Sequence, residues 1–277
     1  MTLRILFGLV FATGCITHAE HVTTMTPVAV PGRVHVHVLT DDGSVRVSTA
    51  DIAQVELQVV SRGYDVPDDL ELSMTPHEGR VDIVAKTRPR VRIFDVTSRS
   101  LRLEVRIPRN VDVEVNSGDG SVEVDAIAGS LDIRTGDGHI AVRGARGIIR
   151  LHTGDGSIEG RDIDGSIDAA TRDGHVRLEG RFDALTVHTG DGKLVANAWP
   201  GSRMMQPWHL QTGDGSVALG LPGDLGARID ASTKDGRVRS TFPLQQLGSS
   251  HVGGDINGGG PPIVVRTRDG SIRLSQI

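Results

Sequence analysis

The sequence predicts an all-β protein, namely a β-solenoid of the β-roll or β-helix kind with coils of about 18 residues, preceded by a β-rich N-terminal part. Three observations support this prediction. A turn motif of the form Thr-Gly-Asp-Gly recurs at equal intervals. Apolar and polar residues alternate on either side of each turn, which is the pattern of half-buried strands. No segment sustains the periodicity of an amphipathic helix.

The composition indicates a narrow aliphatic interior. Among 277 residues there are 35 glycines but only five Phe, two Trp and one Tyr. The core must therefore consist of Val, Ile, Leu and Ala, and a wide cofactor pocket lined by aromatic rings is not expected. The formal net charge of −5 gives no reason to expect a nucleic-acid partner. No cofactor is expected, apart from the calcium considered below.

Residues 1–14 have the form of a secretory signal, because Arg4 precedes a short apolar run that ends in small residues. The run is too short for a transmembrane helix. The segment Ala12-Thr13-Gly14-Cys15 resembles a bacterial lipobox, in which cleavage before the cysteine accompanies lipid attachment to its thiol. We therefore predict lipidation at Cys15, the only cysteine, and a lipoprotein of the outer membrane or periplasm. The alternative is an ordinary signal that is cut nearby and leaves a free thiol.

Residues 15–30 are expected to form a linker, and residues 31–115 a separate β-rich region. Short alternating segments follow one another through that region, with Pro67 and Pro89 between them. The segments are VHVHV (34–38), VRV (45–47), VELQVV (55–60), LELSM (70–74), VDIVA (81–85), LRLEVRI (101–107) and VDVEV (111–115).

Residues 116–277 contain the solenoid repeats. The aspartates of the first five turns stand 18 residues apart, and they are Asp119, Asp137, Asp155, Asp173 and Asp191. Later copies lie at Asp214, Asp235 and Asp269, and an early relative lies at Asp42. Because the later intervals are longer, we expect insertions at 197–210 and 243–262.

Equivalent positions of the 18-residue units fall into apolar columns, as expected if the units stack. One such column is Val122, Ile140, Ile158, Val176 and Leu194. Threonines at the strand ends form a further column and could hydrogen-bond along a ladder. Two architectures fit these columns: a solenoid with equivalent residues about 4.8 Å apart, and an antiparallel meander, since Asp-Gly is also a hairpin signal. The constant spacing favours the solenoid.

The chain resembles bacterial β-strand-repeat proteins of the DUF4097 type, which are labelled as adhesins. The resemblance rests on residues 101–124 (LRLEVRIPRNVDVEVNSGDGSVEV), on the TGDGSI units and on residues 258–274 (GGGPPIVVRTRDGSIRL). It covers most of residues 31–277. The resemblance implies an exported, non-catalytic β-solenoid, and it supplies no catalytic residues.

The aspartate column carries the sharpest chemical signal. Stacked coils would place its five like charges about 5 Å apart, at a cost of about 1 kcal/mol per neighbouring pair in water. Calcium could offset that repulsion, although the spacing differs from the calcium-binding nonapeptide of β-rolls. The alternative is that each aspartate occupies a turn position, bonds its own backbone and tolerates a positive φ beside glycine.

The histidines and serines form no catalytic motif. His139 and His175 are two coils apart, too far to share one zinc ion. His35 and His37 lie on one strand face and could meet a metal. No serine stands in a G-x-S-x-G nucleophile context, and we therefore expect no enzyme.

Two surface segments could carry binding. The insertion WPGSRMMQPW (199–208) holds Trp199, Met204, Met205 and Trp208, and large apolar residues on a protruding loop are typical of contact sites. Alternatively, this insertion folds back over a flank or an end of the solenoid.

The second segment is basic. Residues 88–109 contain seven arginines against two acidic residues, beginning with Arg88, Arg90 and Arg92. These arginines could meet anionic headgroups, lipopolysaccharide or a glycan. The alternative is that they are ordinary exposed residues on alternating strands.

Together these features predict a non-catalytic exported lipoprotein that serves as an adhesin or as an envelope binding or scaffold module. Its expected partners are the membrane, through the lipid, and an envelope glycan or a membrane protein. One alternative is a structural or stress-signalling lipoprotein that acts through a membrane partner. Another is a glycan-active enzyme on a β-helix, whose acidic groove the aspartate column could imitate.

Overall fold

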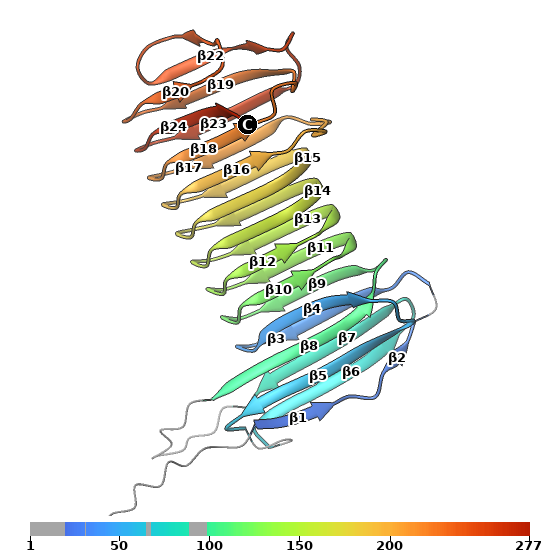
Figure 1. Ribbon diagram of the computed structural model, residues 1–277. Helices are drawn as coiled ribbons and strands as arrows, with labels where there is room; N and C mark the ends of the chain where they lie inside the picture. Colours follow the sequence, from blue (N-terminus) through green and yellow to red (C-terminus); the bar gives the residue numbers. More distant parts are fainter. Residues whose placement is uncertain (1–19, 31, 65–67, 89–98) are drawn as a thin grey trace, which may run out of the picture.

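A computed structural model describes residues 20–30, 32–64, 68–88 and 99–277. These residues form an elongated stack of strands that lie across its long axis, with the chain running from one end of the stack toward the other (Figure 1). The strands belong to two facing layers, and a coil is one strand from each layer together with its turns. The prediction of an all-β solenoid is confirmed.

Each layer is a ladder of hydrogen-bonded strands. Layer one contains, in spatial order, β6 (Leu70–His77), β7 (Arg80–Thr87), β3 (His35–Thr40), β9 (Asp112–Ser117), β11 (Ala128–Thr135), β13 (Arg146–Thr153), the second halves of β14 (Ile158–Thr171) and β15 (Val176–Thr189), β17 (Trp208–Thr212), β23 (Pro262–Thr267), β19 (Ala227–Thr233), β22 (His251–Ile256) and β21 (Gln245–Gln246). Layer two contains β1 (Glu20–Thr24) and β2 (Val28–Ala29) beside β5 (Gln54–Arg62), then β8 (Ser100–Pro108), β4 (Ser44–Ala50), β10 (Val122–Asp125), β12 (Ile140–Arg143), the first halves of β14 and β15, β16 (Leu194–Ala198), β18 (Val217–Leu221), β24 (Ile272–Gln276) and β20 (Val238–Ser240).

The repeat coils pair in parallel and in register. Val122 pairs with Ile140, Ile140 with Ile158, and Ile158 with Val176. The predicted column is therefore confirmed residue by residue, and the antiparallel meander is wrong for these repeats. A meander would have placed equivalent residues on every second strand.

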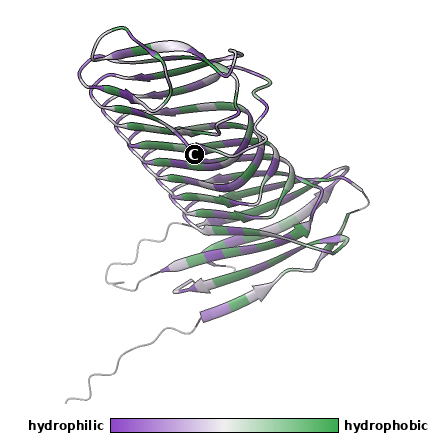
Figure 2. Cartoon of the chain, turned by 45° about the horizontal axis from the view of Figure 1, so that its top comes forward, coloured by the Kyte–Doolittle hydropathy of each residue, from purple (hydrophilic) through white to green (hydrophobic). Residues whose placement is uncertain are grey.

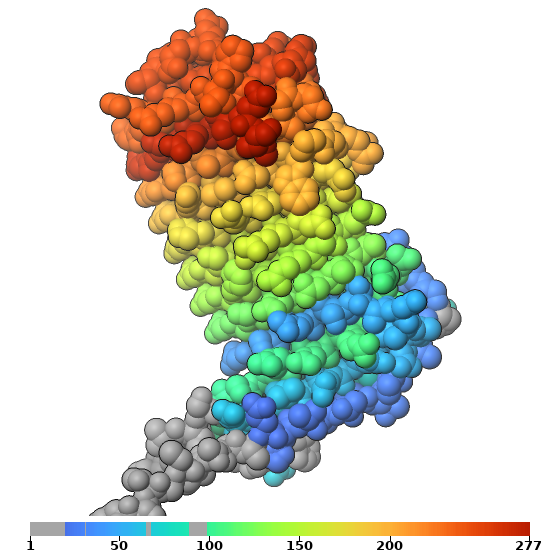
Figure 3. All heavy atoms as spheres, in the orientation of Figure 1, coloured from blue at the N-terminus to red at the C-terminus, as the bar shows by residue number. Residues whose placement is uncertain are grey.

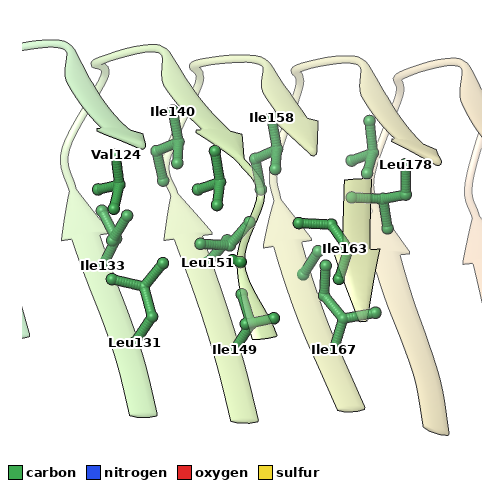
Figure 4. Close-up of a cluster of buried hydrophobic side chains, with 14 of the residues drawn as sticks. Val124, Leu131, Ile133, Ile140, Ile149, Leu151, Ile158, Ile163, Ile167 and Leu178 are labelled. Atoms are coloured by element: carbon green, nitrogen blue, oxygen red, sulfur yellow. The ribbon is translucent and has the colours of Figure 1, made fainter. Parts of the chain in front are cut away.

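Alternation along the strands separates a dry interior from a polar exterior (Figure 2). Leu131, Ile133, Ile149 and Leu151 are buried and meet the side chains of the facing layer (Figure 4). Because each layer contributes one row of side chains per coil, the interior is thin, which explains why aliphatic residues fill it with few rings. Successive coils pack without a break along the face shown in Figure 3.

A buried threonine closes the Asp-Gly turns, except in the turn of Asp119, where Ser117 takes its place. In the coil of Thr171, the hydroxyl Oγ1 donates to the carbonyl oxygens of Gly154 and Gly156 in the preceding coil, at 3.0 and 2.9 Å. The same Oγ1 accepts a hydrogen bond from the backbone N of Gly174 at 3.2 Å. The predicted threonine ladder therefore exists, but each hydroxyl bonds backbone groups rather than the next threonine.

The glycine after each turn aspartate is required by close stacking. A Cβ on Gly156 would lie well inside 3.0 Å of the carbonyl oxygen of Gly138 in the neighbouring coil. Neither the turn aspartates nor these glycines have a positive φ. The expectation of left-handed backbone at these turns is therefore wrong, since the constraint is the space between coils.

Antiparallel strands close both ends of the stack. At the N-terminal end β5 runs antiparallel to β8, and β6 runs antiparallel to β7. Strands β1 and β2 pair with β5, so residues that the sequence places in a linker form part of this cap. At the other end β22, from the expected insertion at 243–262, runs antiparallel to β19. Such caps turn the coil edges away from further pairing.

The spatial order of coils departs from the chain order at both ends. The pair β3–β4 lies between β7–β8 and β9–β10. The pair β23–β24, the last in the chain, lies between β17–β18 and β19–β20. Val45 pairs directly with Val122. The β-rich region at 31–115 is therefore continuous with the repeats, although the sequence separates the two.

Candidate binding surfaces

The aspartate column lies along one edge of the stack, on the turns that lead from layer one to layer two. Arginine replaces the first glycine of the motif in two coils, and it reaches the aspartate of the neighbouring coil. Arg172 lies 3.4 Å from Asp155, and the Arg268 Nε donates to Asp214 at 3.0 Å. These ion pairs offset part of the repulsion between stacked aspartates.

Within the described residues, no three histidine, cysteine, aspartate or glutamate side chains converge to hold a metal ion. The turns that carry Asp119, Asp137, Asp155, Asp173 and Asp191 thus present one carboxylate per coil. Hard cations such as calcium take six to eight oxygen ligands. The column alone falls short of such a set.

The insertion at 199–208 is partly core and partly surface. Trp208 opens β17 and is fully buried, with its ring edge-on to Phe182 at a centroid distance of 6.0 Å. Met204 is also buried. The suggestion that these two residues form a contact surface is wrong, because both fill the interior where the regular repeat is interrupted.

The other two candidates of the insertion face solvent. Trp199 is 36% exposed and Met205 is 72% exposed. The loop that carries them is fixed to the preceding coil, because Ser202 Oγ accepts from the Phe182 backbone N at 3.1 Å. The insertion therefore presents two large apolar side chains from a defined position on the stack.

The described arginines of the basic segment lie on both layers, because Arg88 follows β7 in layer one and Arg106 lies on β8 in layer two. Arg106 pairs with Glu56 at 2.8 Å, and Arg88 lies 3.4 Å from Glu71. The guanidinium of Arg99 lies over the ring of Tyr64, 5.4 Å from its centroid. Arg90 and Arg92 lie outside the described residues. These three arginines thus have carboxylate or aromatic neighbours, which lowers the excess positive charge that a headgroup would meet.

The histidines of β3 belong to a polar network on the outer face of layer one. His37 Nδ1 lies 3.1 Å from Asp82 Oδ1, and its Nε2 lies 3.2 Å from Asn116 Nδ2. Burial acts to raise the pKa of Asp82, but hydrogen bonds from Arg80 and His37 outweigh it and hold that pKa below its ordinary value. This arrangement is an ion-pair network, and the expected metal contact of His35 and His37 finds no third ligand among the described side chains.

No nucleophile and base come together within the described residues. No serine hydroxyl there bonds a histidine ring, and the serine Oγ of Ser157 accepts only from the backbone N of His175, at 3.3 Å. A general base must lie within hydrogen-bond reach of the proton that it removes. The described surface therefore contains no Ser-His arrangement of the hydrolytic kind.

Two surface residues, Ile148 and Arg203, were not predicted from the sequence. Ile148 is 52% exposed, and it follows Gly147 on the outward phase of β13. The signal was present, because Ile148 and Ile149 are adjacent and break the alternation. Arg203 binds Asp183 through Nε and Nη2, both at 3.1 Å. Only the length of the insertion hinted at this second contact.

Cys15 lies outside the described residues, as does the signal segment. In the described part of the chain, no helix is long and apolar enough to cross a membrane.

Comparison with known proteins identifies the family. A family profile described as Toastrack DUF4097 matches residues 35–275. The chain belongs to this family. The match runs from β3 to β24, so this toastrack unit includes both coil pairs whose spatial order departs from chain order. A search of curated proteins gives no match.

Solved structures resemble the chain at low identity. A "putative lipid binding protein" from Parabacteroides distasonis is 11% identical, with a TM-score of 0.53, over 93% of this chain and 96% of its own. A "putative adhesin" from Parabacteroides merdae is 9% identical, with a TM-score of 0.47, over 95% and 98%. Another from Bacteroides fragilis is 9% identical, with a TM-score of 0.42, over 93% and 97%. At 11% identity, the likeness to the Parabacteroides distasonis structure concerns the fold alone.

Proposed function

We propose that this toastrack protein is a non-catalytic, lipid-anchored binding module of the bacterial cell envelope, used in adhesion. The observation that carries the proposal is the filled interior. Side chains such as Ile133, Ile140 and Leu151 are buried between the layers. A fold with a packed interior acts through its outer surface, and here that surface carries ion pairs and the projecting insertion.

The position of the N-terminus supports a tether. Strand β1 begins at Glu20 in the cap at one end of the stack, and only four residues (16–19) separate it from Cys15, the predicted first residue of the mature chain. A lipid on Cys15 would hold that end at the membrane. The insertion at 199–208 and the C-terminal cap would then lie farther along the stack, away from the bilayer (Figure 1).

The proposal is tested by the binding of purified protein to isolated envelope fractions and to cells. A double variant, Trp199→Ala with Met205→Ala, removes the exposed apolar side chains but leaves the buried Trp208 and Met204 in place. We expect wild-type binding that saturates and a clear loss in the double variant. Binding that is absent in the wild type would contradict the proposal.

A structural or stress-signalling lipoprotein is the second candidate, and the same material distinguishes it. Recovery of a single membrane protein in place of glycan or cell binding would favour signalling through that partner. Cleavage of an envelope glycan by the wild type would instead favour an enzyme, and the variants Asp155→Asn and Asp173→Asn would then locate its carboxylates.

A further inference from the structure

A groove of about 760 Å³ lies beside the insertion, on the edge of the stack opposite the Asp-Gly turns. Its floor consists of the segments of β13, β14 and β15 where the chain enters layer one. Pro200 and Gly201 form a wall. A regular repeat produces a flat flank. The concavity exists because the coil between Asp191 and Asp214 has 23 residues in place of 18.

Charged side chains of both signs line this groove. Arg146 and Arg181 both pair with Asp164, at 3.3 and 2.8 Å, and Arg203 binds Asp183 through two nitrogens. A guanidinium carries five N–H donors, so these pairs leave donors on each arginine for a ligand. Three guanidiniums against two carboxylates give the groove a small positive excess within a chain whose net charge is −5.

An apolar side chain accompanies the charges. Ile148, half exposed, lines the floor together with Gly147 and Gly165. Glycine in the floor lets a sugar ring approach the backbone closely.

We propose that this groove binds an acidic polysaccharide, with sugar carboxylates on the arginines and sugar hydroxyls between arginines and aspartates. This inference rests on the proposed binding function and names its ligand class. Arginine matches a carboxylate with two parallel hydrogen bonds. The aspartates accept from sugar hydroxyls, which are donors and acceptors at once.

The same observations disfavour a peptide. The floor segments of β13 and β14 are hydrogen-bonded on both sides to neighbouring coils. The far side of the β15 segment is bonded by the insertion, where Gln206 N donates to Asp183 O and Ser202 Oγ accepts from Phe182 N, so the floor offers little open edge for an added strand. A densely phosphorylated ligand is disfavoured as well, because it would bring more negative charge than the small positive excess of the groove balances.

The test is a calorimetric titration of the purified protein with tetragalacturonate and with its fully methyl-esterified form. The two probes share a sugar backbone and differ in charge. We expect the acid to bind about tenfold more tightly than the ester, a difference of about 1.4 kcal/mol. Polyglutamate of similar length serves as a control for charge alone.

Variants locate the site. Arg146→Gln should weaken the binding of the acid about tenfold, as expected for one charge-assisted contact. Ile148→Ala, which removes the exposed apolar side chain of the floor, should weaken both sugar probes. Arg177→Gln is the matched control, because Arg177 is an exposed arginine of β15 that pairs with Glu179 outside the groove, and it should leave affinity unchanged.

Three results would overturn the inference. They are absent or equal binding of the two sugar probes by the wild type, equally tight binding of polyglutamate, and an equal loss in Arg177→Gln and Arg146→Gln. If envelope binding persists while tetragalacturonate fails to bind, the proposed function stands and only this ligand class is wrong.

Discussion

The turn threonines should stabilise the stack through the hydrogen bonds of their hydroxyl groups, and the variant Thr171→Val tests this. Valine has nearly the same shape, so the packing of the buried side chain is preserved. The substitution removes the hydrogen bonds from Oγ1 to Gly154 and Gly156. It also leaves the backbone N of Gly174 without the acceptor that lies 3.2 Å away in the wild type.

The expected magnitude follows from two opposing contributions. A buried donor that loses its partner costs about 1–3 kcal/mol. The added methyl group returns about 0.8 kcal/mol through burial. The free energy of unfolding should therefore fall by about 0.2–2.2 kcal/mol, which lowers the urea midpoint by up to about 0.7 M if the slope is about 3 kcal/mol per M.

Urea unfolding followed by circular dichroism measures the change. Ser117→Ala is the matched control, since Ser117 occupies the threonine position of its own coil and its Oγ is buried without a partner. That control should change the midpoint little. A midpoint in Thr171→Val equal to the wild type, or a loss in Ser117→Ala of the same size, would refute the ladder.

Four further predictions concern packing, charge and metal. Gly156→Ala should destabilise strongly by forcing neighbouring coils apart, whereas Gly253→Ala, where a Cβ has ordinary contacts, should be tolerated; thermal unfolding distinguishes them. Trp208→Ala should cost about 3–5 kcal/mol as a large-to-small core change, measured by urea unfolding. The pKa of Asp230 lies below its ordinary 3.8, chiefly because a hydrogen bond from Arg266 stabilises the carboxylate by more than desolvation destabilises it. The stabilisation is therefore present above the unfolded pKa and lost as pH falls through the lower folded pKa, and Asp230→Asn should flatten that acid-induced loss in pH titrations of the urea midpoint. A chelator should leave the melting temperature of the protein unchanged. A lower melting temperature in the chelator would instead support calcium binding along the aspartate column.

The repeats could be predicted from the sequence because two periodicities agree. Alternation placed Ile140 and Ile158 on the inward face, and the 18-residue spacing placed them in one column. Register in a sheet is strongly specified when one face is buried, because a slip of one residue exposes the whole apolar set. The same reasoning located Thr171 at the turn, although it did not predict that its partners are backbone groups.

The ends of the stack could not be predicted in this way. Val265 of β23 pairs with both Leu210 and Ala231, yet β23 follows both of those strands in the chain. Many neighbours are compatible with an alternating apolar strand, and only tertiary packing selects among them. Residues 20–24 show no clear alternation, so their pairing with β5 was hidden as well.

The candidate surfaces were half predicted. A run of large apolar residues in a loop is equally typical of a binding surface and of a buried segment. Trp208 and Met204 are buried because their side chains fill the interior where the regular coil is interrupted. Trp199 and Met205 remained exposed. The groove required Arg146 and Arg203 to meet across several coils, which no local pattern records.

The proposed lipid tether at Cys15 would hold this toastrack protein at the membrane by its N-terminal end. Metabolic labelling of producing cells with an alkyne fatty acid, followed by fractionation, detects such a tether. Labelled wild-type protein is expected in the envelope fraction, and unlabelled protein for Cys15→Ser. Wild-type protein without label, or label that persists in Cys15→Ser, would contradict the proposed tether.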